Sequence, residues 1–113
     1  MEHDIRPWGE YLVLDDSSTH KVKRIVVKPR GRLSYQYHQH RSEVWTIVQG
    51  EAIITLDGEN KNFKSGDVVL IPQGSKHRIQ NSGKNKLIFV EVQLGTYFGE
   101  DDIVRIEDDY ARS

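Results

Sequence analysis

Short runs rich in β-branched and aromatic residues, each closed by a turn residue, recur along the chain. HKVKRIVVK (residues 20–28) ends at Pro29, and GDVVLIPQG (residues 66–74) is predicted to be a buried strand that stops at Pro72. The Asp57-Gly58 pair is typical of a tight hairpin turn. Together the runs predict about eight to ten strands with turn signals about every 8–12 residues, which is typical of a β-sandwich or a closed barrel.

The segment RLSYQYH (residues 32–38) alternates as a half-buried strand does. Ser34, Gln36 and His38 share its polar face, and the aromatic face is expected to serve in packing or in a subunit contact. The acidic tail GEDDIVRIEDDYARS (residues 99–113) is expected to be a short helix or an arm packed on the barrel. Since no other segment has a helical apolar period, we predict one all-β domain over residues 1–113.

Composition narrows the classes of function. The 113 residues carry a net charge of −1, which argues against a general nucleic-acid partner. The chain has no cysteine, so disulfides and thiolate metal sites are excluded, and any metal must use nitrogen and oxygen ligands. The sequence shows neither a signal peptide nor an apolar run long enough for a membrane span, so a cytoplasmic protein without a membrane partner is expected.

Two stretches carry candidate chemistry, and the first is GDVVLIPQGSKHRIQN (Gly66–Asn81). Gly66 permits the turn that enters a strand, Pro72 ends the strand, and Gly74 allows the chain to double back. His77 then opens the next strand and points to one face. This position makes His77 a candidate metal ligand.

The second stretch is SYQYHQHRSE (residues 34–43), which leaves two ligand sets open. If His38 and His40 are the ligands beside Glu43, only Arg41-Ser42 would form the loop, and two-residue hairpin loops favour Asn, Asp and Gly instead. If Gln36 and His38 are the ligands, a four-residue loop Gln39–Ser42 joins two strands. His38 and Glu43 would then be a directly opposed cross-strand pair, and His40 would lie at the mouth of the site. Turn chemistry favours the second set.

The spacings resemble the two motifs of the cupin superfamily. The match to the second motif is complete over Gly66–Asn81, and Glu43 and Gly50 stand at the spacing of the first. Four residues between His38 and Glu43 fit the family pattern, whereas two residues between His40 and Glu43 do not, and Gly31 sits one residue late. The resemblance implies a jelly-roll barrel with a bound metal.

The chain also resembles the type II phosphomannose isomerase domain, from Arg6 to Arg112. RPWGEYLVL, IPQGSKHRIQN and GTYFGEDDIVRIEDDYAR carry this resemblance, and LSYQYH (residues 33–38) matches the segment that supplies Gln and His to zinc in type I enzymes. The family usually has a His where this chain has Val44. The domain is usually the C-terminal part of bifunctional enzymes with a guanylyltransferase, but no Gly-rich nucleotide-binding loop is found here, so guanylyltransferase activity is not expected.

The resemblance implies interconversion of mannose 6-phosphate and fructose 6-phosphate through an enediolate. A divalent metal, zinc by preference, with manganese, iron or nickel as alternatives, would be held by Gln36, His38, Glu43 and His77, with His40 as the alternative to Gln36. The proton would be carried by His40 or Lys23. The phosphate would be bound first by Arg105, which we also count among the catalytic candidates, and then by Arg24, Lys28 or Arg78.

Two other functions compete with the isomerase. A metal-containing cupin can be a non-catalytic module that binds a sugar or a partner protein, and Val44 favours considering it. Another cupin chemistry, oxygenation at iron, usually uses three His and one Glu, so Gln36 as a ligand speaks against it. A homodimer is expected from the resemblance and from the need to cover sheet edges.

Overall fold

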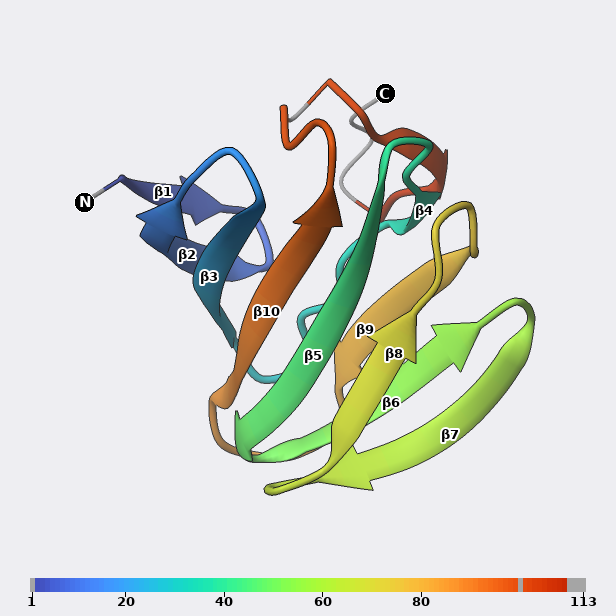
Figure 1. Cartoon of the computed structure of the whole chain (residues 1–113). Helices are drawn as coiled ribbons and strands as arrows, with labels where there is room; N and C mark the ends of the chain where they lie inside the picture. Colours follow the sequence, from blue (N-terminus) through green and yellow to red (C-terminus); the bar gives the residue numbers. More distant parts are fainter. Residues whose placement is uncertain (1, 100, 110–113) are drawn as a thin grey trace.

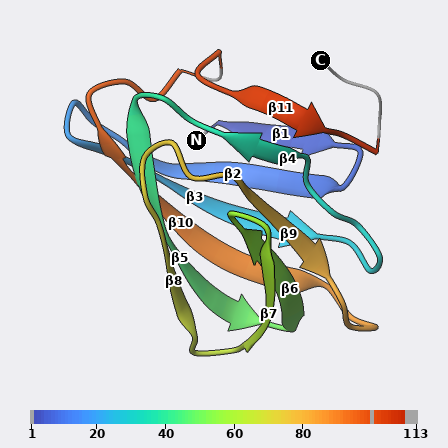
Figure 2. The ribbon, with the colours of Figure 1, turned by 90° about the vertical axis from the view of Figure 1, so that its right-hand side faces the viewer.

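The computed structural model describes residues 2–99 and 101–109, and all regular structure in this part of the chain is β-strand. The prediction of an all-β fold is confirmed, and the strands form two sheets that face each other (Figures 1 and 2). The larger sheet contains, in spatial order, β1 (His3–Arg6), β2 (Gly9–Asp16), β3 (His20–Val27), β10 (Leu87–Gly95), β5 (Arg41–Gln49) and β8 (Val68–Ile71). The smaller sheet contains β11 (Val104–Glu107), β4 (Tyr35–Tyr37), β9 (His77–Asn81), β6 (Glu51–Leu56) and β7 (Glu59–Lys64).

Local sequence explains the β6–β7 hairpin. Leu56 pairs with Glu59, so Asp57 and Gly58 form a two-residue loop, with φ angles of 48° and 86°. Positive φ at both central residues is the geometry that Asp-Gly favours, because its twist matches that of the strands. The predicted hairpin is confirmed.

Two strand predictions are wrong in detail, and one of the two alternatives for the tail is wrong. The segments around His38 and Glu43 do not form a hairpin, because β4 belongs to the smaller sheet and β5 to the larger one. Of the two alternatives for the tail, the helix is wrong and the arm is confirmed where the tail is described, because β11 pairs antiparallel with β4; Glu100 and residues 110–113 lie outside the described residues. β8 is buried on one side only, since Val69 and Ile71 are buried but Val68 and Leu70 are exposed.

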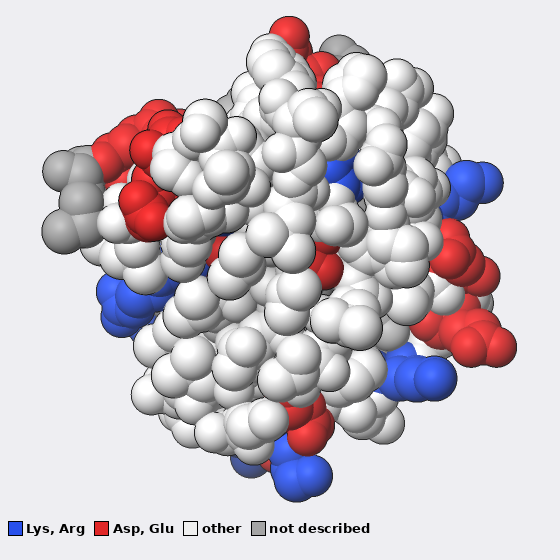
Figure 3. Space-filling model, viewed as in Figure 1, with Lys and Arg blue, Asp and Glu red and all other residues white. Residues whose placement is uncertain are grey.

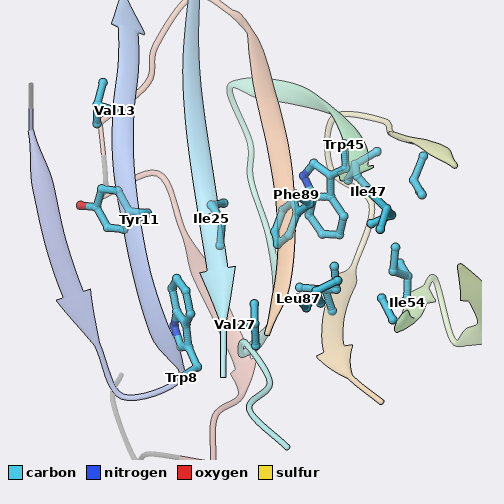
Figure 4. Close-up of a cluster of buried hydrophobic side chains, with 14 residues drawn as sticks. Trp8, Tyr11, Val13, Ile25, Val27, Trp45, Ile47, Ile54, Leu87 and Phe89 are labelled. Carbon is cyan, nitrogen blue, oxygen red and sulfur yellow. The ribbon is translucent and has the colours of Figure 1, made fainter. Parts of the chain in front are cut away.

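The hydrophobic core lies between the two sheets. Figure 4 shows side chains of β2, β3, β10, β5 and β6 pointing into the same space. Trp45 packs against Phe89 with ring centroids 5.1 Å apart, and both are buried. Leu33, which precedes β4, also packs on this core. The core stops short of one end of the barrel, where inward-facing side chains become polar. No helix in the described residues is long and apolar enough to cross a membrane.

Candidate metal centre and active-site cavity

Strand register brings three predicted polar residues into one row of the smaller sheet. Gln36 of β4 pairs with His77 of β9 on one side and with Arg105 of β11 on the other. Directly paired residues on neighbouring strands project to the same face of a sheet. Gln36 and His77 are buried and Arg105 is half-buried, so the row faces the interior.

The larger sheet supplies carboxyl groups and a lysine from the opposite side. Glu91 of β10 pairs with Lys23 of β3 and with Trp45 of β5, and Glu43 pairs with Gln93 of β10. All five of these residues are buried. In β10 the inward positions change from Leu87 and Phe89 to Glu91 and Gln93, and this is where the apolar core gives way to a polar cavity.

His38, Glu43 and His77 meet between the sheets and can hold a metal ion. Each offers one ligand atom, and these atoms lie within 4.8 Å of one another. Nδ1 of His38 is 3.6 Å from Oε2 of Glu43, and the two imidazole rings stack with centroids 5.2 Å apart. His38 follows β4 and Glu43 lies on β5, so the predicted proximity is achieved across the barrel and not by cross-strand pairing.

Both imidazoles are neutral, the form in which histidine binds metals. Burial, the Arg41 charge and the neighbouring His77 lower the pKa of His38 to about 3. Burial also lowers the pKa of His77. Nδ1 of His77 donates to the Ser75 carbonyl at 2.9 Å, because a carbonyl can only accept, and this leaves Nε2 free for a cation.

Gln36 and Glu43 complete a mixed set of nitrogen and oxygen donors. The Gln36 amide nitrogen donates to Oγ of Ser34 at 2.9 Å, so its carbonyl oxygen is the atom available to a cation. Oε1 of Glu43 accepts a hydrogen bond from Nε1 of Trp45 at 2.9 Å. Two neutral imidazoles, one carboxylate and one amide oxygen fit a divalent metal such as zinc.

Arg41 is the main residue of the site that was not predicted. Its side chain is buried, its Nε donates to Oε2 of Glu43 at 2.9 Å, and its Nη2 donates to Nε2 of His38 at the same distance. Its Nη1 is buried and has no hydrogen-bond partner within the described part of the chain. Arg41 therefore contacts two candidate ligands at once, and its remaining donor, Nη1, has no partner among the described residues.

The surrounding cavity has a volume of about 100 Å³ and is cationic. Its lining contains five cationic side chains and two carboxyl groups. The cations are Arg6, Lys23, Arg41, Arg78 and Arg105, and the carboxyl groups are Glu43 and Glu91. An excess of positive charge at a partly closed site favours an anionic ligand.

Other predicted residues lie outside this cavity. His40 is exposed on the loop after β4 and does not line the cavity. Its ring and that of Tyr97 are arranged edge to face, with centroids 6.1 Å apart. Arg24 and Lys28 are also exposed and absent from the lining. Arg24 projects from the outer side of β3, because the inward positions of that strand are Lys23 and Ile25.

One further cavity residue, Glu91, had a signal in the sequence. LIFVEVQ alternates so that Glu91 and Gln93 share a face with the buried Leu87 and Phe89, and this pattern predicts inward polar groups. Burial and then the Glu43 charge raise the pKa of Glu91 to about 7. Arg6 also lines the cavity, but its place beside Pro7 in the sequence carries no comparable signal.

Val44, which stands where the family usually has a histidine, does not face the site. Val44 lies between two buried residues, Glu43 and Trp45, and pairs with Val92 and Leu70 on the outer side of the sheet. Loss of a histidine at this position therefore removes no group from the cavity.

Comparison with known proteins identifies the family. The family model described as "Mannose-6-phosphate isomerase C-terminal" matches residues 2–108. A mannose-1-phosphate guanylyltransferase of Salmonella montevideo is 49% identical over 108 residues, with 96% of this chain and 23% of that protein covered. The xanthan biosynthesis protein XanB of Xanthomonas campestris (strain B100) is 47% identical over 108 residues, with 96% of this chain and 23% of that protein covered.

Among solved structures, the oxalate decarboxylase of Lactobacillus farciminis superposes with a TM-score of 0.81 at 24% identity, over 93% of this chain and 33% of that chain. That likeness shows the shared two-sheet cupin fold alone. The chain spans about a quarter of the length of the two proteins it matches in sequence. Its own match extends over nearly all of its residues, and the chain belongs to the mannose-6-phosphate isomerase C-terminal family.

Proposed function

We propose that this domain is a metal-dependent sugar-phosphate isomerase that interconverts mannose 6-phosphate and fructose 6-phosphate. The observation that carries the proposal is the juxtaposition of the His38, Glu43 and His77 cluster with five cationic side chains in one cavity. The family match supports the substrate class, and the cationic lining suits a phosphorylated sugar. We do not propose guanylyltransferase activity for this domain. We propose a cytoplasmic location, as expected from the sequence.

The metal would be held by His38, Glu43, His77 and the amide oxygen of Gln36. Zinc suits this donor set best, while manganese, iron and nickel share the preference for imidazole and carboxylate. When bound, the ion supplies polarisation of the sugar carbonyl and stabilisation of the oxyanion that develops on it.

The phosphate group would be bound by Arg105, with Arg78 beside it. Arg105 lies in the same row as Gln36 and His77, so a sugar bound there would extend from the ligand cluster toward the guanidinium. Arg78 also lines the cavity, but its Nε already donates to the Leu33 carbonyl at 2.9 Å. We keep Arg105 as the principal phosphate ligand because it shares the row of Gln36 and His77.

Proton transfer between the two adjacent carbons of the sugar would use Lys23 or Glu91. An aldose becomes a ketose when a base removes the proton from C2 and returns a proton to C1 through an enediolate, while a second proton moves from O2 to O1. Both side chains line the cavity, whereas His40 does not. Glu91, with its pKa raised to about 7 by burial and by the Glu43 charge, exists in both protonation forms near neutral pH.

A binding module is the second candidate function, and Arg41 favours it. Its guanidinium already supplies a positive charge to Glu43 and a donor to His38, so the pair is neutralised without an ion. In this alternative the free Nη1 of Arg41 would bind an anionic group of a sugar ligand.

An assay coupled to fructose 6-phosphate formation separates the two functions. The metal-loaded protein should turn over mannose 6-phosphate, and Lys23→Met or Glu91→Gln should reduce kcat by about 100-fold or more if the residue carries the proton. Arg105→Gln should raise KM with a smaller effect on kcat. Arg24→Gln is the matched control, because Arg24 lies outside the cavity. Saturable sugar-phosphate binding without turnover would support the binding module.

A further inference from the structure

The C-terminal arm (residues 101–109) carries Arg105 to the cavity, although the aliphatic residues on either side of Arg105 are exposed. β11 pairs with the three-residue strand β4 at the edge of the smaller sheet, and the register shifts between Arg105 and Glu107 (Figure 2). Val104 is 37% exposed and Ile106 44%. Since these two side chains bury little apolar surface, polar contacts are needed to keep β11 docked.

Arg32 and Asp109 form a bidentate ion pair at the end of the arm. Nη2 of Arg32 donates to Oδ1 of Asp109 at 2.7 Å, and its Nε donates to Oδ2. Pairs of this geometry are stronger and more directional than single hydrogen bonds. Arg32 also forms a β-bridge with Gln80 of β9, so its backbone is fixed to the smaller sheet. The pair therefore ties the end of the arm to that sheet.

Arg78 holds the arm between this pair and the cavity. Its side chain is buried, and its Nη2 donates to the main-chain carbonyl of Glu107 at 3.1 Å. The same nitrogen lies 3.9 Å from Oδ1 of Asp109. Arg78 also follows the candidate ligand His77 in β9, so the contacts of the arm converge on the strand that carries part of the site.

The other end of the arm is tied to the segment after β4. The Asp102 carboxylate accepts hydrogen bonds from the amides of Gln39 and His40, directly after the candidate ligand His38. Arg105 thus lies between two carboxylates that are both bound to the smaller sheet or to the segment that follows its strand, Asp102 before it and Asp109 after it. These contacts fix the position of the intervening chain.

The Arg32–Asp109 pair belongs to the charged surface and not to the cavity. Neither residue lines the cavity, and their side chains are 36% and 39% exposed. Figure 3 shows basic and acidic groups next to each other along the edge where the smaller sheet lies, whereas few appear over β10, β5 and β8. Surface ion pairs contribute little to the stability of a whole fold, so variants of this pair should remain folded.

We propose that Arg32 and Asp109 are positioning residues for sugar-phosphate binding, because their ion pair outside the cavity holds the arm so that Arg105 faces the phosphate. This role rests on the proposed function, in which Arg105 is the principal phosphate ligand. An arm that is docked for only part of the time would raise the apparent Kd of the ligand in inverse proportion to the docked fraction.

Removal of each partner distinguishes this role from simple electrostatics. If charge alone mattered, Asp109→Asn would remove a negative charge and tighten the binding of an anion, whereas Arg32→Gln would weaken it. If the pair holds the arm, both variants should weaken binding, although they change the net charge in opposite directions. The double variant should then be no weaker than either single variant.

Isothermal titration calorimetry of the zinc-loaded protein with mannose 6-phosphate tests the role. We expect Asp109→Asn and Arg32→Gln each to raise Kd by about fivefold or more, and KM to rise with little change in kcat. In protein that already carries Arg105→Gln, adding Asp109→Asn should change Kd by less than about twofold, because the pair acts through Arg105. Asp16→Asn is the matched control, since it removes the same charge from an exposed position at the end of β2 and should leave Kd unchanged.

Unchanged or tighter binding in Asp109→Asn, or an equal loss with and without Arg105, would overturn the positioning role. If the wild type also turns over mannose 6-phosphate, the proposed function stands and only this role fails. A wild type that binds mannose 6-phosphate without turnover, but is weakened by Asp109→Asn, would support the role and contradict the isomerase. A wild type that does not bind mannose 6-phosphate would overturn both.

Discussion

Nε of Arg41 donates a hydrogen bond to Oε2 of Glu43 at 2.9 Å, and both side chains are almost fully buried. The same guanidinium donates to Nε2 of His38. Removal of one partner from a buried ion pair costs about 3–5 kcal/mol, because the other charge is left uncompensated. We therefore expect Arg41→Gln to lower the free energy of unfolding of the metal-free protein by about 3 kcal/mol, measured by urea denaturation.

The same variant should bind metal more tightly. A guanidinium beside Glu43 repels a divalent cation and occupies the lone pair of His38, so its removal should lower the zinc Kd by about tenfold or more. Isothermal titration calorimetry with a competing chelator measures this directly. Arg24→Gln, on the outer face, should change neither property. A weaker zinc affinity in Arg41→Gln would show instead that Arg41 orients the ligands.

Ligand variants should identify the metal shell. We expect His77→Ala to weaken zinc binding by more than about 100-fold, since even loss of the outer contacts of a ligand costs about 10–100-fold. Gln36→Ala should also weaken binding, whereas His40→Ala should not, because His40 is exposed outside the cavity. Metal content measured by inductively coupled plasma mass spectrometry after dialysis checks all three. Loss of metal in His40→Ala with retention in Gln36→Ala would reverse the ligand assignment.

The stability of the metal-free protein should depend on pH through two buried groups, His38 and Glu91, whose contributions change in opposite directions. The folded-state pKa of His38 is depressed to about 3, so the unfolded chain binds more protons below its usual pKa of 6.5 and stability falls as pH decreases from about 6.5 toward 3. The folded-state pKa of Glu91 is raised from 4.5 to about 7, so the folded chain binds more protons there and the contribution of Glu91 is lost as pH rises through this range.

Urea titrations at several pH values separate the two contributions. Between pH 4.5 and 6.5 the two contributions oppose each other, so His38→Gln should leave stability falling as pH rises through this range, and Glu91→Gln should leave it falling as pH decreases. NMR of the wild type should show the His38 ring neutral at pH 5. A His38 ring that titrates near pH 6.5 would contradict its burial beside Arg41.

Asp102 should stabilise the loop that carries His38. Its Oδ1 accepts from the Gln39 amide at 3.0 Å and its Oδ2 from the His40 amide at 2.9 Å. Asp102→Ala leaves both donors without this partner, so we expect the free energy of unfolding to fall by about 1–3 kcal/mol. Asp101→Ala is the control, because Asp101 is exposed. Hydrogen exchange should also speed up at the two amides, and unchanged exchange would contradict the role of Asp102.

Local sequence predicted those features that depend on a few neighbouring residues. The Asp57-Gly58 turn follows from the backbone preferences of two residues, and His77 follows from the turn chemistry of Pro72 and Gly74 before it. The spacing of His38 and Glu43 correctly predicted that they lie close together. The predicted cross-strand pairing is wrong, because the two residues meet across the barrel. A strand–loop–strand segment has the same local sequence pattern whether its strands pair in one sheet or belong to two different sheets. The segments of β4 and β5 were therefore wrongly predicted to form a hairpin.

Arg41 was not predicted to belong to the site, because a charged residue in a polar segment is expected to be exposed. Its burial depends on Glu43 and His38, which reach it only after both sheets have formed. The one-sided exposure of β8 was missed for a related reason. An apolar run such as Val68–Ile71 indicates how much surface needs to be covered, but not whether the same chain covers it.

We propose that the cavity isomerises sugar phosphates with a bound metal, and a single measurement tests this most directly. Protein loaded with zinc to one equivalent is mixed with mannose 6-phosphate, and fructose 6-phosphate is followed by a coupled assay before chelation, after chelation and after zinc is restored. We expect turnover that disappears with the chelator and returns with the metal, and that is absent in His77→Ala. A folded, fully loaded protein that forms no fructose 6-phosphate would contradict the claim.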